Sequence, residues 1–457
     1  MASRDEVALD LTPPQEPVGA ASRLQRWLTR PWAPPAFAAL LAAVIAGRGI
    51  SALPLRFDEF FSLTAVVTDP RISITHEGPL VPYYTVLWLW TLGGELTSDT
   101  WLRVLSLVAV IATAVVTALI AKRLAGVLVA YAAAGLFALN PGVHFVAQDA
   151  RPYALGMLLF TAAAFVLLRA VEGSQRGDWV GFSVLVLLGT VMMPNGLIIF
   201  APLTLLYSQI RPRFFVAKRF LLALVPTVLL LIVGIVAFSS AIATMRASLP
   251  SPAVSWIPTG VIWTGIAEAE SYGAPGTFAA VLLVLAGLTA QGRRVLWGVL
   301  GSVLLVWVIS QGPSSQWMGR TFITFIPLVT IAAAFAVARM KRTEIIAVMV
   351  VTVLLAGPGY TAVRLWDAPA DLRLATEVIE READATDQIF GDGYLGEGRS
   401  FELAAGVKHY AATEPPWEVT TEPTREFWLL YPDYPCEELF SEDVRGGMNL
   451  RRCAAPS

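Results

Sequence analysis

The chain has 457 residues, of which 56% are hydrophobic and 15% are charged, and its mean hydropathy is +0.62. Because soluble domains carry about 25% charged residues, this composition excludes a soluble globular protein and predicts a polytopic membrane protein. The net charge of -2 leaves no basic face that could neutralise nucleic-acid phosphates, so we expect no nucleic-acid partner.

The N-terminal segment is polar, contains proline and ends in Arg23, Arg26 and Arg30. A secretory signal would instead have a short basic start and a small-residue cleavage site. We therefore predict a cytoplasmic tail over 1–32, followed by a first membrane span that is not cleaved.

Apolar segments of about 20 residues, long enough to cross a bilayer, follow this tail. We place them at 33–53, 103–121, 124–142, 153–170, 178–194, 196–210, 219–240, 275–291, 295–310, 321–338 and 344–363. Lysine and arginine groups fall at alternate boundaries between them, as the positive-inside rule requires. The predicted fold class is therefore all-α, with about eleven crossings over a membrane domain at 33–364, the N-terminus inside and the C-terminus outside.

One further apolar segment, 79–94, is excluded from the count, because a crossing there would place Lys122-Arg123 outside and reverse every later loop. Its four large aromatic residues suit a helix at the level of the lipid headgroups. We predict membrane-surface helices in this first outer loop. The aromatic residues are Tyr83, Tyr84, Trp88 and Trp90.

The tail from residue 365 is more acidic and has no long apolar run. An amphipathic pattern predicts a helix over 371–386, and short apolar runs predict strands at 388–394 and 427–431. We predict a small extracytoplasmic α/β domain over 365–457. The only two cysteines, Cys436 and Cys453, lie in it, and an extracytoplasmic position would allow a disulfide between them.

Two charged clusters are predicted to lie on the same outer face. Asp58-Glu59 follows the first span, and Asp149-Ala150-Arg151 follows the third. Charges beside lipid persist mainly when they are paired, buried in protein or used in chemistry. We therefore take Asp58, Glu59 and Asp149 as candidate catalytic residues, the alternative for the first pair being a solvated loop or an N-cap for a helix at 60–67.

Arginines on this face are candidates for binding an anion, because the planar guanidinium binds phosphate oxygens bidentately. Arg103, Arg151 and Arg320 each lie where a loop meets a span, at the depth of the lipid phosphate. The alternative is that they extend to the interface and anchor helix ends. The three histidines are too scattered to indicate a metal site, and no P-loop, G-x-G-x-x-G or G-x-S-x-G motif is present.

A family resemblance joins these segments. The motifs that carry it are Arg56-Phe57-Asp58-Glu59, Gly78-Pro79-Leu80, Tyr83-Tyr84, Leu102-Arg103, Gln148-Asp149-Ala150-Arg151-Pro152-Tyr153-Ala154-Leu155, and Arg320 ahead of Pro327. Together they resemble the GT-C glycosyltransferases, and within them the bacterial branch related to protein O-mannosyltransferases and aminoarabinose transferases. The sequence departs from that branch at Glu77, where many relatives have a His-Pro-Pro-Leu segment, and at Thr321, where they have tyrosine.

The resemblance implies an enzyme of the outer membrane face that takes a sugar from a polyprenyl-phosphate carrier and inverts the anomeric centre. It implies that Asp58 activates the acceptor hydroxyl and that Asp149 supports the site. Arg151 and Arg320 would face the lipid phosphate. We also count the neighbouring tyrosines as candidate substrate-binding residues, namely Tyr83, Tyr84 and Tyr153.

Two functions stay open at this point. The first is a glycosyltransferase that moves mannose or another hexose to a glycan, lipid or protein of the cell envelope. The second is a transporter or flippase of a lipid-linked sugar, although transporters tend to place polar groups at the bilayer midplane, whereas these lie in outer loops. The sequence also leaves open whether a divalent metal ion joins Asp58 and Asp149.

Overall fold

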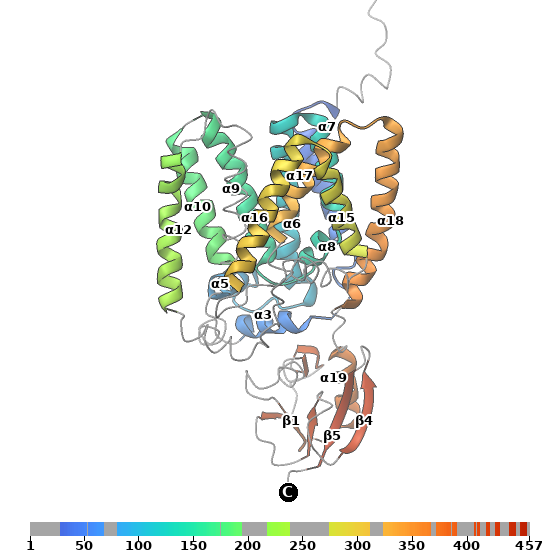
Figure 1. Ribbon diagram of the computed structural model, residues 1–457. Coiled ribbons are helices and arrows are strands. Elements are labelled where there is room, and N and C mark those ends of the chain that lie inside the picture. The colour runs from blue at the N-terminus through green and yellow to red at the C-terminus, as the bar shows by residue number, and fades with distance from the viewer. Residues whose placement is uncertain are drawn as a thin grey trace, which may run out of the picture.

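The computed structural model describes residues 28–52, 54–67, 80–173, 175–193, 217–237, 274–310, 323–366, 372–384, 386–390, 406–407, 409–411, 417–420, 426–429, 438–444 and 448–454. The helices before residue 367 form a bundle, and a small sheet domain lies beyond one end of it (Figure 1). The bundle helices are α2 (Ala33–Ala46), α3 (Phe57–Val67), α5 (Val81–Trp90), α6 (Asp99–Ala125), α7 (Val127–Ala138), α8 (Pro141–Ala147), α9 (Tyr153–Gly173), α10 (Arg176–Met192), α12 (Ala217–Ala237), α15 (Ala274–Gly287), α16 (Ala290–Ser310), α17 (Ile326–Val337) and α18 (Arg342–Trp366).

Every predicted span except 196–210 overlaps one of these helices. The segment 196–210 is not among the described residues. Among the described residues, α6 and α9 are long and apolar enough to cross a membrane. The consecutive helices α7 and α8 pass the same test together but meet at a bend of 65°. Apolar side chains are exposed along α12 and α18, as expected where a helix faces lipid rather than water.

Small side chains bring the first helices close together. Ala38, Ala42 and Ala46 recur every four residues along α2, so they share one face, and all three are fully buried in a cluster with residues of α6 and α7. Helices in lipid gain their association energy from such close van der Waals contact. The three helices therefore provide a tightly packed support for the loops at their ends.

The segment 79–94 forms α5, a helix of 10 residues. At a rise of about 1.5 Å per residue it is roughly half as long as the hydrocarbon core is thick, so it is too short to cross. It lies with α3 at the end of the bundle that faces the sheet domain (Figure 1). Trp90 and Trp101 fix it to α6, because their rings stack at 5.0 Å and each indole N–H donates to the other's backbone carbonyl.

The C-terminal domain combines helix α19 (Leu372–Glu382) with a five-stranded sheet in the order β2-β1-β3-β5-β4. The strands are β1 (Gln388–Phe390), β2 (Glu418–Thr420), β3 (Phe427–Leu429), β4 (Glu438–Val444) and β5 (Met448–Cys453). β1 pairs in parallel with β2 and β3, whereas β5 pairs antiparallel with β3 and β4. Cys453 is disulfide-bonded, and Cys436, the only other cysteine of the chain, lies outside the described residues.

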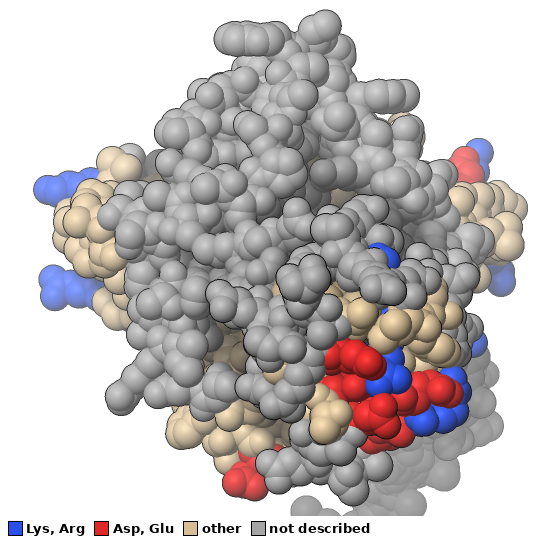
Figure 2. Space-filling model, turned by 90° about the horizontal axis from the view of Figure 1, so that it is seen from below, with Lys and Arg blue, Asp and Glu red and all other residues tan. Residues whose placement is uncertain are grey.

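Polar contacts fix the loop before β1 within this domain. Asp387 is 3% exposed and accepts hydrogen bonds from the indole of Trp428 at 2.9 Å and from Arg452 at 2.9 Å. Arg452 also pairs with Asp384 and Glu426. Seen from the side of the C-terminal domain, acidic and basic side chains gather in one region of the surface (Figure 2).

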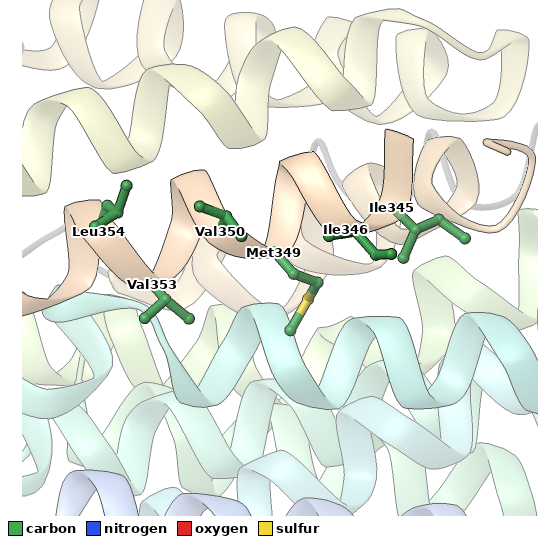
Figure 3. A pocket seen from close by; sticks show the side chains of 6 residues that line it. All are labelled: Ile345, Ile346, Met349, Val350, Val353 and Leu354. Atoms are coloured by element: carbon green, nitrogen blue, oxygen red, sulfur yellow. The ribbon is translucent and has the colours of Figure 1, made fainter. Parts of the chain in front are cut away.

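A shallow cavity of about 350 Å³ lies along α18. Its lining is entirely apolar, with side chains that project from one helix (Figure 3). They are Ile345, Ile346, Met349, Val350, Val353 and Leu354. Because it contains no polar group, this cavity suits lipid chains and provides nothing for acid–base chemistry.

We expect thiol labelling to place the two ends of the bundle on opposite sides of the membrane. Glu95 follows α5 at the end near the C-terminal domain, whereas Arg294 follows the turn between α15 and α16 at the other end (Figure 1). Cysteines introduced near Glu95 and within 266–272 should react with an impermeant reagent from outside, and one near Arg294 should not. Outside labelling near Arg294 would contradict the predicted orientation.

Candidate active site

Three segments that are distant in sequence meet at the end of the bundle next to the C-terminal domain. They are the start of α3, the first turns of α6 and the loop 148–152 between α8 and α9. The carboxylate of Glu59 lies where they meet and is fully buried. A buried charge is tolerated only when it is paired and hydrogen-bonded, so the partners of Glu59 define the centre of the site.

Glu59 first acts on its own helix. α3 begins at Phe57, so Arg56 is its N-cap residue and Glu59 is the third helical residue. The Oε2 of Glu59 accepts the backbone N–H of Arg56 at 2.8 Å, which is the Glu half of a capping box. The alternative role of the Asp58-Glu59 pair as an N-cap for a helix at 60–67 is wrong, because the helix starts earlier, at Phe57, and Glu59 closes its first turn.

Arg103 of α6 provides the counter-charge. Its Nε donates to Glu59 Oε1 at 2.8 Å, its Nη2 donates to Oε2, and the two side chains are 2% and 0% exposed. The same guanidinium donates to the carbonyl oxygens of Ile50 and Pro54. Burial opposes ionisation of Glu59, but Arg103 and the Arg56 N–H outweigh it and lower its pKa.

From the sequence, Glu59 was a candidate catalytic residue and Arg103 a candidate phosphate ligand. In the structure these two residues, 44 positions apart in sequence, bind each other. Their hydrogen-bonding groups are directed at one another and at the surrounding backbone. This geometry favours a structural role for both, in which the pair joins the start of α3 to α6.

The second loop is attached to the same centre. The N–H of Ala150 donates to Glu59 Oε1 at 2.9 Å, and its carbonyl accepts the hydroxyl of Ser62 at 2.7 Å. The hydroxyl of Ser106 donates to the carbonyl of Asp149 at 2.7 Å. The backbone on both sides of the Asp149–Ala150 bond is therefore held by α3 and α6, which ties this loop to the segment that carries Glu59.

The preceding residue, Gln148, fixes this loop to the end of α2. Its side-chain amide donates to the carbonyl oxygens of Ala46 and Arg48 at 3.1 and 2.8 Å. The Nδ1 of His144 in α8 lies 3.3 Å from the carbonyl of Ile45. Both side chains therefore fix this part of the chain to the end of α2.

The two tyrosines of α5 extend into the same region rather than toward lipid headgroups. Both are fully buried, and their rings lie 5.7 Å apart. The hydroxyl of Tyr84 accepts a hydrogen bond from Arg151 at 2.8 Å. Burial and the nearby Asp149 raise the pKa of Tyr83 well above 10, so its hydroxyl stays protonated beside the acidic residues. The structure thus gathers Asp149, Arg151, Tyr83 and Tyr84 around one point.

Arg56 belongs to this site although the sequence analysis did not select it. Its guanidinium lies 4.3 Å above the ring of Phe145 and is 4% exposed, and its buried Nη1 has no hydrogen-bond partner among the described residues. A buried guanidinium nitrogen without an acceptor is costly unless a ligand provides one. Its position at the start of the Arg56-Phe57-Asp58-Glu59 motif was the feature of the sequence that could have identified Arg56 as a site residue.

The other predicted site residues are placed as follows. Asp58 is the second residue of α3, but its side chain lies outside the described part of the structure, as does Arg320. Tyr153 begins α9 and packs against the hydrophobic cluster of α2, α6 and α8. Within the described residues, no group of three His, Cys, Asp or Glu could hold a metal ion. The divalent ion that the sequence leaves open between Asp58 and Asp149 would involve the Asp58 side chain, which lies outside the described residues.

The fold places the chain in a structural class. Its bundle of apolar helices, its short helices at one end and its small C-terminal sheet domain have the fold seen in solved structures of ArnT. ArnT from Cupriavidus metallidurans bound to undecaprenyl phosphate superposes with a TM-score of 0.53 at 13% identity, over 94% of this chain and 100% of ArnT. The apo structure of ArnT gives 0.56 at 12% identity, over 95% and 100%. No family model and no curated protein matches the sequence.

Proposed function

We propose that this protein is a glycosyltransferase that takes a sugar from a polyprenyl-phosphate carrier and passes it to an acceptor outside the cell membrane. The observation that carries the proposal is the group of buried charges at one end of the bundle, where Arg56, Arg151 and Asp149 lie next to the start of α3. The fold supports the proposal, because ArnT has the same fold and was solved bound to undecaprenyl phosphate.

The proposed reaction is a single inverting displacement. Asp58 takes the proton of the acceptor hydroxyl while its oxygen forms a bond to the anomeric carbon of the sugar. The bond from that carbon to the phosphate oxygen breaks on the opposite side, and its electron pair leaves with polyprenyl phosphate. The donor sugar we propose is mannose or another hexose, and the acceptor is a glycan, lipid or protein of the cell envelope.

The leaving phosphate needs cations, because negative charge accumulates on it as the bond breaks. Arg103 is engaged by Glu59, so we assign this role to Arg151 and Arg56, with Arg320 as a third candidate. Tyr84 orients Arg151 through its hydroxyl, and the ring of Phe145 supports Arg56. We place this site and the C-terminal domain, 365–457, on the extracytoplasmic side of a multi-pass membrane domain at 33–364.

Arg151→Lys should weaken the use of the donor, because lysine keeps the charge but loses the planar fork that binds two phosphate oxygens. We expect the KM for the polyprenyl-phosphate sugar to rise about tenfold, the equivalent of one charge-assisted hydrogen bond. Arg169→Lys is the matched control, since Arg169 is exposed and pairs with Asp178 away from the site. Equal KM values for the two variants would contradict the phosphate assignment.

Reconstitution in liposomes tests the proposed function itself. The purified protein should release free polyprenyl phosphate from a polyprenyl-phosphate hexose only when an acceptor from the cell envelope is present. A flippase would instead move the intact donor across the bilayer without breaking the sugar–phosphate bond. Mass spectrometry of envelope glycans and lipids from a deletion strain would then identify the sugar and the acceptor. Transport of intact donor without release would contradict the proposal.

A further inference from the structure

The C-terminal domain makes a polar contact with the segment that carries the site. The hydroxyl of Tyr410 accepts the backbone N–H of Leu55 at 2.9 Å and donates to Asp99 Oδ2 at 3.0 Å. The neighbouring His409 places its Nε2 2.7 Å from Asp99 Oδ1. One tyrosine hydroxyl therefore bridges the loop before α3 and the first residue of α6, from a position more than 300 residues later in the chain.

Apolar contacts enclose this bridge. The ring of Tyr410 meets the ring of Phe60 edge to face, with centroids 6.3 Å apart. Leu55 and Phe60 are fully buried in one hydrophobic cluster with Leu372 of α19 and Trp428 of β3. The C-terminal domain is thus packed directly against the start of α3, and the hydrogen bonds of the Tyr410 hydroxyl are partly buried.

The contact acts on a segment that is also held from the opposite side. The carbonyl of Pro54 accepts a hydrogen bond from Arg103, while the N–H of the next residue, Leu55, is bound by Tyr410. The first turn of α3 starts at Arg56, whose carbonyl accepts the N–H groups of Glu59 and Phe60. A displacement of Leu55 would therefore rotate or shift the turn that carries Arg56 and Asp58.

We propose that Tyr410 is a positioning residue of the transfer reaction: through Leu55 and Asp99, the C-terminal domain sets the place of Asp58 and Arg56. The inference rests on the proposed function, in which Asp58 is the general base. A general base must lie about 3 Å from the proton it removes, and a displacement of about 1 Å can cost on the order of 10²-fold in rate. Burial and the adjacent Asp99 raise the pKa of Tyr410, so its hydroxyl stays a donor at neutral pH.

Tyr410→Phe tests the proposal, because it removes the hydroxyl and keeps the ring against Phe60. We expect kcat to fall about tenfold, within the range that misplacement allows, while the KM for the polyprenyl-phosphate sugar stays unchanged. Tyr131→Phe is the matched control: it removes a tyrosine hydroxyl that donates to the carbonyl of Leu28 at 3.0 Å, far from the site. It should leave both constants unchanged.

A double-mutant cycle separates positioning from general stabilisation. If Tyr410 acts through Asp58, Tyr410→Phe should cause little further loss in an Asp58→Asn background, because the base it positions is already absent. A tenfold loss in both backgrounds would overturn the proposal, as would a wild-type kcat for Tyr410→Phe. A lower melting temperature with kcat and KM affected together would show a structural role only.

Amide hydrogen exchange tests the contact of Tyr410 with Leu55 without a measurement of sugar transfer. Peptides covering 54–60 should exchange faster in Tyr410→Phe than in wild type or Tyr131→Phe, since the bond to the N–H of Leu55 is lost. Unchanged exchange would overturn the proposal. If Tyr410→Phe exchanges faster but the wild-type protein releases no polyprenyl phosphate, the proposed transferase is contradicted, while Tyr410 is still shown to hold this segment.

Discussion

Asp58→Asn is expected to reduce sugar transfer by about 10²–10⁴-fold, the contribution typical of general-base catalysis. Asparagine keeps the size of the side chain and its position on α3, but it cannot accept the proton of the acceptor hydroxyl. Donor binding should survive, because the proposed phosphate ligands are arginines on other segments. The measurement is single-turnover release of polyprenyl phosphate together with a separate titration of donor binding.

The matched control for this variant is Glu95→Gln, which neutralises an exposed carboxylate in the turn after α5. It should transfer sugar at the wild-type rate. An Asp58→Asn protein that folds, binds donor and transfers sugar at a rate near that of wild type would rule out the mechanism.

Glu59→Gln is expected to act on stability rather than on the chemical step. It removes the charge that compensates the buried guanidinium of Arg103, and breaking a buried pair in this way costs about 3–5 kcal/mol. We expect a lower melting temperature and less folded protein in detergent, with the remaining folded fraction still able to bind donor. Because the pKa of Glu59 is lowered below its ordinary value of 4.5, the stability it provides is complete above that pH and declines as the pH falls below it.

Replacing both members of the pair by apolar residues of similar volume, Glu59→Leu with Arg103→Met, should recover part of the lost stability, since no uncompensated charge remains. Arg103→Met alone should be about as damaging as Glu59→Gln. A Glu59→Gln protein with an unchanged melting temperature and a strongly reduced rate would reverse the assignment and return Glu59 to the reaction. The contrast between adjacent residues is informative, because neighbours on a helix point in different directions.

The long helices of the bundle were largely predictable from the sequence, because they are apolar runs that lysine or arginine groups separate. The exclusion of 79–94 as a crossing agrees with the short α5, and it depended on the charge at Lys122-Arg123 rather than on hydropathy. The strands at 388–390 and 427–429 lie within their predicted ranges. β2, β4 and β5 were missed, since strands of mixed polar composition give no clear alternation.

The site was predictable as a set of segments but not as a set of partners. The sequence indicated that residues 56–59, 103 and 149–151 would lie at one face. It could not show that Glu59 and Arg103 would pair with each other, because two charges 44 residues apart have many possible partners until the helices pack. The same limit applies to Tyr410, which contacts Leu55 and Asp99 although each lies more than 300 residues earlier in the sequence.

The carboxylate of Glu59 also has a consequence for how the chain assembles during synthesis. Its donors come from Arg56, Arg103 and Ala150, all within about the first third of the chain. Chains acquire structure from the N-terminus as they emerge, so this centre can close while the later helices are still being translated. The C-terminal domain emerges last, and Tyr410 reaches Leu55 only after every helix has been inserted. A molecule truncated before the last domain would therefore retain its charged centre but leave the N–H of Leu55 without the partner that completes the site.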